Sequence, residues 1–170
     1  MDIRQEQPSD YARVAEVVEA AFGRPNEARL VELVRASDSY VPELSLVAEV
    51  EGTVIGHVMF SYAALEREND SVRVLVMAPV SVVPEWQSRG AGGAMIRAGI
   101  ERAEARGEPL VQVLGHPGYY PRFGFERARQ QGIEPPSEQV PDAAFMLLKL
   151  SAYDERYRGR IVYPPAFDVT

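Results

Sequence analysis

The sequence predicts an α/β (α+β) fold in a single domain, with a central mixed and partly splayed β-sheet flanked by helices. Three observations predict it. Apolar residues recur at helical spacing near the start, long extended apolar runs begin at Leu44, and a strand, turn, helix and strand follow one another from Val80 to Leu114. A helical crossover of this kind makes the two strands that it joins parallel, which gives the sheet its mixed character.

The segment before Leu44 contains a short strand and two helices. Residues 1–6 can form the strand, and a first helix follows with its apolar positions on one face: Val14, Val17, Val18, Ala21 and Phe22. Gly23-Arg24-Pro25 ends that helix, Asn26 can cap a second one, and residues 37–43 form a loop. The chain therefore enters the strand region after two helices that each bury one face.

The middle of the chain consists of strands. Residues 44–50 and 53–60 form a hairpin around the two-residue turn Glu51-Gly52. Residues 72–83 have the apolar character of a central strand, but Pro79 cannot donate a hydrogen bond to a ladder. We expect the strand to be interrupted near Pro79, which leaves unpaired backbone groups that could accept an extended ligand as a substitute strand.

The second half of the chain alternates a helix with short strands. After a glycine-rich turn, an amphipathic helix spans residues 94–106 and a short apolar strand spans residues 110–114. Residues 143–150 form a final buried strand, and residues 151–170 form a tail that packs on the body. No repeat or composition change divides the chain, so one domain covers residues 1–170.

Composition excludes several classes of function. The 170 residues contain no cysteine, which excludes a disulfide framework, a thiolate metal site and a cysteine nucleophile, and no metal is expected. A net charge of −7 argues against nucleic acid or an anionic membrane as the main partner, since both need a basic surface. No signal pattern and no run of membrane-spanning length is present, so a cytoplasmic protein is the expectation.

The glycine-rich turn from Gln87 to Ala94 joins a strand to a helix. A helix N-terminus presents unpaired N–H groups and the positive end of the helix dipole, so this junction favours a bound phosphate. Two common phosphate loops do not fit: Gly92-Gly93-Ala94 lacks the lysine and hydroxyl of a Walker A loop, and Met95 stands where a dinucleotide fingerprint needs glycine. What remains is the pattern Gln87-x-x-Gly90-x-Gly92.

This pattern resembles the acyl-CoA signature Gln/Arg-x-x-Gly-x-Gly/Ala of the GNAT superfamily of acetyl-CoA-dependent N-acetyltransferases. The order of the expected elements agrees along most of the chain. Ala78-Pro79-Val80, residues 119–125 (Tyr-Tyr-Pro-Arg-Phe-Gly-Phe) and residues 163–167 (Tyr-Pro-Pro-Ala-Phe) are similar to the YhbS-type branch of predicted acetyltransferases. The resemblance implies a GNAT-like fold, acetyl-CoA as cosubstrate, and direct transfer of the acetyl group to a primary amine of a small molecule or peptide in a ternary complex.

The resemblance also implies roles for individual residues. Val82 and Val83 would pair with the pantetheine amides, and a backbone N–H there would polarise the acetyl carbonyl. Tyr120, four residues before Gly124, would be the general acid that protonates the departing CoA thiolate. Backbone N–H groups of the turn would bind the CoA pyrophosphate, with the Arg89 side chain adding a charge-assisted contact. The turn residues in this role are Gln87, Ser88, Arg89, Gly90, Ala91, Gly92, Gly93 and Ala94.

Several of these assignments have alternatives. The glycines could serve only a tight turn, and Tyr119 could replace Tyr120 as the acid. The general base is unassigned, because His116 is a side chain suited to the task but an ordered water chain would suffice. A second class of function is an acyl-CoA-binding module that senses the ligand, or contacts another protein, without turnover. A homodimer is expected by resemblance, and the sequence does not indicate which amine is the acceptor.

Overall fold

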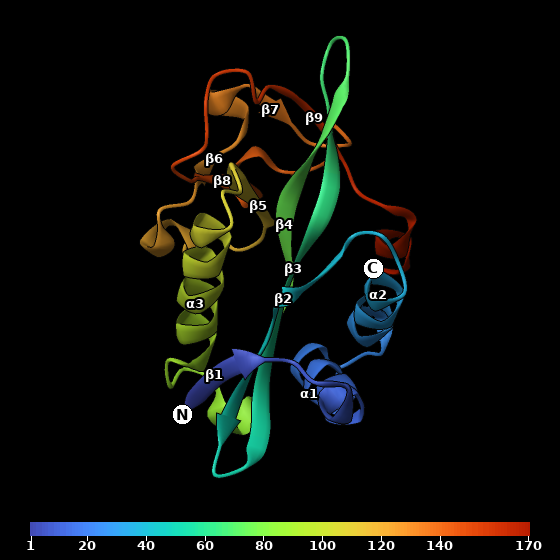
Figure 1. Cartoon of the computed structure of the whole chain (residues 1–170), viewed down its shortest axis with the longest axis vertical. Coiled ribbons are helices and arrows are strands. Elements are labelled where there is room, and N and C mark those ends of the chain that lie inside the picture. Colours follow the sequence, from blue (N-terminus) through green and yellow to red (C-terminus); the bar gives the residue numbers. More distant parts are fainter. The chain divides into compact units, whose positions relative to one another are not determined.

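The computed structural model describes residues 1–170 (Figure 1), and the chain divides into two compact units. Unit 1 contains residues 1–61, 77–102 and 165–170, and unit 2 contains residues 62–76 and 103–164. Two long strands, β3 (Thr53–Glu66) and β4 (Ser71–Val82), run through both units. The prediction that the whole chain forms one domain stays a prediction.

Unit 1 contains three helices and the first strands of the sheet. The strands β1 (Asp2–Gln5) and β2 (Tyr40–Val50) pair antiparallel, and β2 pairs antiparallel with β3. The helices are α1 (Tyr11–Phe22), α2 (Asn26–Arg35) and α3 (Ala91–Ala105), the last of which ends in unit 2. A short 3₁₀ turn at Pro165–Val169 contacts α2, where the Asn26 side chain donates to the Val169 carbonyl at 2.8 Å.

Unit 2 is built from short strands. β5 (Leu110–Leu114) pairs parallel with β4 and antiparallel with β8 (Phe145–Lys149), and β8 pairs with β6 (Glu126–Arg127). β9 (Gly159–Val162) pairs with β3 and with β7 (Ile133–Glu134). The strands follow the order β1-β2-β3-β4-β5-β8-β6, with only the β4–β5 and β7–β9 pairs parallel among those with a described register. This is the predicted mixed sheet flanked by helices.

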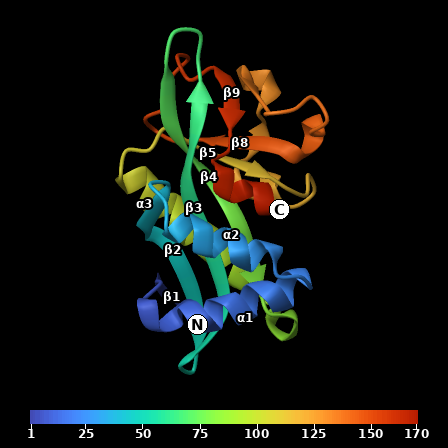
Figure 2. The same ribbon diagram turned by 90° about the vertical axis from the view of Figure 1, so that its right-hand side faces the viewer.

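The helices α1 and α2 lie over the same face of β2 and β3, and α3 covers the opposite face (Figures 1 and 2). Val14, Val17 and Val18 of α1 are fully buried, as their spacing predicts. Phe22, at the end of that helix, is 42% exposed, so its predicted place on the buried face is wrong. The helix ends directly after Phe22, at Gly23, which has a left-handed φ of 71°.

The predicted hairpin turn is confirmed. Glu51 and Gly52 have positive φ angles of 48° and 78°, the signature of a type I′ turn. Gly56 lies next to a register shift between β2 and β3, where a bulge bends the strand. A Cβ atom at Gly56 would lie only 2.8 Å from the Met95 side chain, so the missing side chain lets α3 pack closely on β3.

Four predicted boundaries are wrong. β2 begins at Tyr40 rather than residue 44, because Tyr40 pairs with Ser61 in a β3 that runs well beyond residue 60. β4 continues through Pro79 without interruption. The helix predicted at residues 94–106 begins at Ala91. Its first turn contains two glycines, which a helix tolerates at this position because the N–H groups of the first turn have no partner within the helix. The strand at residues 145–149 is not the last, because β9 follows it.

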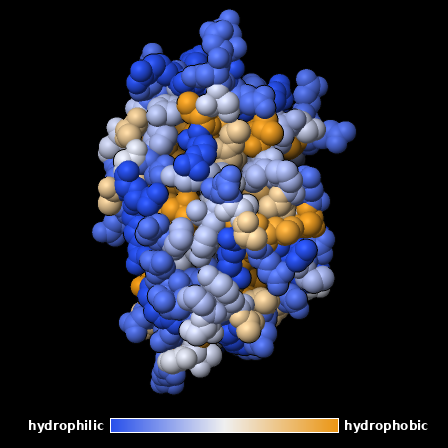
Figure 3. Space-filling view, turned by 45° about the vertical axis from the view of Figure 1, so that its right-hand side comes forward, coloured by the Kyte–Doolittle hydropathy of each residue, from blue (hydrophilic) through white to orange (hydrophobic).

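The surface is predominantly hydrophilic on the face in Figure 3, where apolar residues form small separate patches among polar ones. Large hydrophobic side chains that are exposed are few: Met1, Phe22 and Leu114. None of the helices combines the length and the hydropathy needed to cross a membrane.

Candidate functional site

The glycine-rich turn lies in unit 1 between the end of β4 and the start of α3. A 3₁₀ turn at Pro84–Trp86 follows β4, and Ser88 and Gly90 then adopt left-handed φ angles of 62° and 89°. Two hydrogen bonds fix the turn to the strands. The Val83 N–H donates to the Ile55 carbonyl at 3.0 Å, and the Gln87 side-chain amide donates to the Val82 carbonyl at 2.9 Å.

Six consecutive backbone N–H groups of this turn have no hydrogen-bond partner within the chain. The amides on either side of them do: Gln87 donates to the Pro84 carbonyl at 3.3 Å, and Ala94 donates to the Gly90 carbonyl at 3.0 Å. Unpaired donors at the positive end of a helix dipole are a strong site for an anion. We call these six groups the amide cradle; they belong to Ser88, Arg89, Gly90, Ala91, Gly92 and Gly93.

Arg89 is the cation nearest in sequence to the amide cradle. Its guanidinium lies over the ring of Trp86, with Cζ 5.0 Å from the ring centroid, and the side chain is exposed. A guanidinium stacked on an indole ring loses part of its freedom without losing its charge. Trp86 is the only tryptophan in the sequence, so this turn also carries the chain's single indole fluorophore.

The end of β4 offers one further backbone donor. Pairing of β4 with β5 is limited to Leu75 with Val111 and Val76 with Gln112, so β4 extends past its paired segment, as expected for a partly splayed sheet. Since the Val83 N–H points to β3, the alternation of an extended chain points the Val82 N–H to the other side. Val82 is therefore the candidate donor at this strand end, and the Val83 N–H already has a partner.

Tyr120 lies in unit 2, at the start of a 3₁₀ helix that spans Tyr120–Phe123. Its ring packs edge-on against Tyr119 and Phe125, with centroid distances of 5.1 and 5.8 Å. A Cβ atom at Gly115 would lie 2.4 Å from the same ring, so glycine is required for this packing. Burial, with a smaller effect of Tyr119, raises the pKa of Tyr120 to about 12. Its hydroxyl stays protonated at neutral pH and has no hydrogen-bond partner in the chain.

Tyr119 differs from Tyr120 in its surroundings. The Arg122 guanidinium lies 4.6 Å from the Tyr119 ring centroid, and its Nε donates to the Tyr119 carbonyl at 2.9 Å. Tyr119 therefore packs against Arg122 and Phe123, while Tyr120 packs on Gly115 and Phe125. The choice between the two as the acid stays a prediction.

The histidines of the chain do not offer a free ring nitrogen to a substrate. His116 Nδ1 accepts a hydrogen bond from the Gly118 N–H at 3.1 Å, which places the proton of the neutral ring on Nε2. In that tautomer neither nitrogen has a lone pair left for a base. His57 is fully buried in unit 1. No group of three or more His, Cys, Asp or Glu side chains is arranged to hold a metal ion.

The predicted site residues thus fall into two groups. The strand end and the turn, residues 82–94, lie together in unit 1, whereas Tyr120 lies in unit 2. Sequence reasoning missed a pocket between α1 and α2 that contains Arg35 and Tyr11. No local signal marks it, because its residues come from two helices and are spaced like ordinary surface positions.

The amide cradle lies between the end of β4 and the start of α3, and β4 is no longer paired with β5 at that end. This combination is typical of the acyl-CoA-dependent class of acyltransferases. The comparisons with known proteins give the family. The model of the Acetyltransferase (GNAT) domain matches residues 2–128, and the chain belongs to the GNAT acetyltransferase family.

Individual relatives agree with this family. The chain is 39% identical over 156 residues to YjhQ, an uncharacterized N-acetyltransferase of Escherichia coli K12, covering 90% of this chain and 86% of that one. The GNAT family N-acetyltransferase YhbS of Escherichia coli, solved in complex with CoA, is similar with a TM-score of 0.87 and 27% identity, over 98% and 91% of the two chains. A GNAT family acetyltransferase of Brucella melitensis, solved with acetyl-CoA, has a TM-score of 0.78 and 32% identity over 98% and 97%.

Proposed function

We propose that this protein transfers the acetyl group of acetyl-CoA to a primary amine of a small molecule or peptide. The observation that carries the proposal is the amide cradle, six unpaired N–H groups at the start of α3. Similar proteins solved with CoA and acetyl-CoA support the identity of the anion. The protein would act in the cytoplasm, without nucleic acid or membrane as partner.

The residues of unit 1 would hold the cosubstrate in two parts. The amide cradle would donate hydrogen bonds to the pyrophosphate oxygens, and Arg89 would add a charge-assisted contact. The Val82 N–H would face the acyl arm and polarise the acetyl carbonyl, where negative charge develops as the amine attacks. Because the Gln87 side chain is bonded to the Val82 carbonyl, it would keep the turn and the strand end in one fixed arrangement.

Tyr120 would act as the general acid. The amine nitrogen forms a bond to the acetyl carbon, the carbon–sulfur bond breaks, and the departing thiolate takes its proton from the Tyr120 hydroxyl. The attacking amine gives up its extra proton to water, since the His116 ring has no free lone pair in its hydrogen-bonded tautomer. No covalent enzyme intermediate is needed, because holding both reactants in line provides much of the acceleration.

Two measurements test the proposal. Calorimetry with acetyl-CoA tests binding, and release of CoA thiol from acetyl-CoA with a panel of primary amines tests turnover. We expect micromolar binding and thiol release that depends on the amine. Binding without release for any amine would favour the ligand-sensing module, and absence of binding would refute both functions. A homodimer stays a prediction, which light scattering after size exclusion checks.

A further inference from the structure

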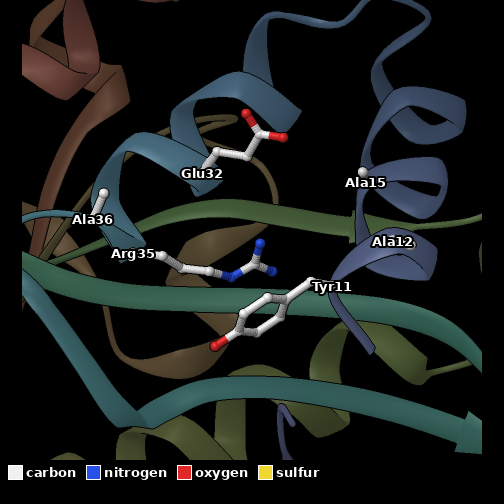
Figure 4. Close-up of a pocket in the computed structure, with 6 residues that line it drawn as sticks. All are labelled: Tyr11, Ala12, Ala15, Glu32, Arg35 and Ala36. Carbon is white, nitrogen blue, oxygen red and sulfur yellow. The ribbon is translucent and has the colours of Figure 1, made fainter. Parts of the chain in front are cut away.

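A pocket of about 450 Å³ lies between α1 and α2 in unit 1 (Figure 4). The helices α1 and α2 lie on the face of β2 and β3 opposite to α3 (Figures 1 and 2), and no residue that lines the pocket belongs to the amide cradle. Volumes of this size are typical of small-molecule sites. The lining residues come from the start of α1 and the end of α2: Tyr11, Ala12, Ala15, Glu32, Arg35 and Ala36.

Arg35 is held in a fixed position at the base of this pocket. Its guanidinium lies over the Tyr11 ring, with Cζ 3.9 Å from the ring centroid, and its side chain is only 11% exposed. The edge formed by Nε and Nη2 donates to the two carboxylate oxygens of Glu6. A planar guanidinium bonded through one edge and stacked through one face has little freedom left.

Glu6 is itself fixed by a cluster of buried polar groups. Its fully buried carboxylate accepts hydrogen bonds from the Tyr40 hydroxyl at 3.0 Å and the Ser45 hydroxyl at 2.7 Å. Because Ser45 donates its proton to Glu6, it accepts from His57 Nε2 at 3.1 Å. Burial alone would raise the pKa of Glu6, but the His57 ring, whose Nε2 lies 3.4 Å from the carboxylate, and the hydrogen bonds from Arg35 and Ser45 hold this pKa well below its ordinary range. The carboxylate therefore stays ionised and Arg35 stays anchored.

The remaining nitrogen of Arg35, Nη1, has no hydrogen-bond partner in the chain. Figure 4 shows one terminal nitrogen of the guanidinium directed away from the strands, toward the side of Glu32. Arg35 lines the pocket, and Nη1 is not one of the buried polar atoms that lack a partner, so this nitrogen is reached from the pocket. This nitrogen is a preorganised donor for an oxygen atom of a ligand.

The rest of the pocket supplies a negative charge, from Glu32, and space for a ligand side chain. The Glu32 side chain is 56% exposed and pairs with Arg29 at 2.9 Å, an exposed ion pair of little net stability that a ligand can displace. Ala12, Ala15 and Ala36 leave the space that larger side chains would fill. The pocket therefore presents a fixed donor and a carboxylate next to each other on α2, with small alanine side chains around them (Figure 4).

We propose that this pocket binds a free α-amino acid. The ligand carboxylate would accept from Arg35 Nη1, the ammonium would pair with Glu32, and the side chain would lie against the alanines. An inorganic phosphate could accept only from Arg35 Nη1 and would be repelled by the nearby carboxylates of Glu6 and Glu32. A simple amine could pair only with the exposed Glu32. A zwitterion is the ligand that uses both groups. The proposal does not depend on acetyl transfer.

Calorimetry of the full chain without acetyl-CoA tests this binding. L-alanine and L-leucine are the probes, and acetate, ethylamine and inorganic phosphate each carry only part of the recognised chemistry. We expect the amino acids to bind about tenfold more tightly than acetate or ethylamine, with no binding of phosphate. Absence of amino acid binding at millimolar concentrations would overturn the proposal, and so would acetate or phosphate binding equally well.

Matched variants locate the site without touching the Arg35–Glu6 pair. Ala15→Leu fills the pocket and should weaken binding by about tenfold or more, whereas Ala20→Leu, at an exposed position of the same helix, should leave it unchanged. Glu32→Gln should weaken amino acid binding by about threefold, while Glu19→Gln should not. Binding that is unaffected by Ala15→Leu and Glu32→Gln would place the amino acid elsewhere and refute this site.

Discussion

The cluster around Glu6 and the amide cradle both gather polar groups in unit 1, and they differ in where these groups find partners. The carboxylate of Glu6 is bonded to Arg35, Tyr40 and Ser45 within the chain. The six N–H groups of the cradle are bonded to nothing within the chain. Polar groups that the fold satisfies stabilise the fold, whereas those that it leaves open are available to a ligand. Each region should therefore respond to a different kind of substitution.

The largest expected effect is on stability, from Glu6→Gln. The substitution leaves the buried Arg35 without its ionic partner, so we expect the free energy of unfolding to fall by about 3–5 kcal/mol. Urea denaturation measures it, and Glu19→Gln, at an exposed position of α1, is the control that should change it by less than about 0.5 kcal/mol. A loss below about 1 kcal/mol for Glu6→Gln would mean that the cluster does not stabilise the fold.

The same cluster should make stability depend on acid. The pKa of Glu6 is lower in the folded chain than in the unfolded one, so the unfolded chain takes up a proton first as the pH falls. The stabilisation is therefore fully present above the unfolded pKa of about 4.3 and is lost as the pH falls from there toward the folded pKa. Urea midpoints measured between neutral and acid pH should fall less steeply in Glu6→Gln than in the unaltered chain.

Tyr120→Phe should affect turnover and leave folding and binding intact. Loss of the general acid should lower kcat by about 100-fold while the Kd for acetyl-CoA stays the same. With a pKa of about 12 in Tyr120, the acid keeps its proton through neutral pH, and its deprotonation should not reduce the rate until the pH is strongly alkaline. Tyr119→Phe is the matched control. Equal losses in both variants would indicate a packing effect, and a loss in Tyr119→Phe alone would assign the acid to Tyr119.

Ala91→Pro tests a single amide of the cradle. Proline is tolerated at the first position of a helix and removes one N–H, so α3 should form while acetyl-CoA binds about tenfold more weakly. Calorimetry measures the affinity, and circular dichroism checks that the helix content is unchanged. Unaltered affinity in a folded variant would show that this N–H does not face the ligand.

Arg89→Gln should give the smallest change. An exposed charge contributes little, so we expect about threefold weaker binding of acetyl-CoA, and the difference should shrink at high salt. The fluorescence of Trp86, the only tryptophan, offers a direct readout because this ring lies under Arg89. Fluorescence that is insensitive to acetyl-CoA in the unaltered chain would argue against a ligand at this turn.

The features that local spacing determines were predictable from sequence. The type I′ turn at Glu51-Gly52 and the buried face of α1 follow from neighbouring residues, as does the strand-to-helix turn at Gln87. Contacts between distant residues were not predictable. The Glu6 carboxylate meets residues 29 to 39 positions away, and no pattern around Glu6 distinguishes it from a surface glutamate. The start of α3 is not predictable for a different reason: glycines favour a turn, although the first turn of a helix has no N–H hydrogen bonds that glycine would weaken.

The interleaving of the two units has a consequence for the order in which the chain can fold. Unit 1 takes in residues from both ends, and the Asn26 side chain is bonded to a carbonyl 143 residues further along. On the ribosome, α2 is therefore made long before the 3₁₀ turn that covers it, and unit 1 cannot be completed until residues 165–170 have emerged. Until then the side of α2 that receives this turn is uncovered, and surface that is uncovered during synthesis makes a nascent chain more prone to aggregate.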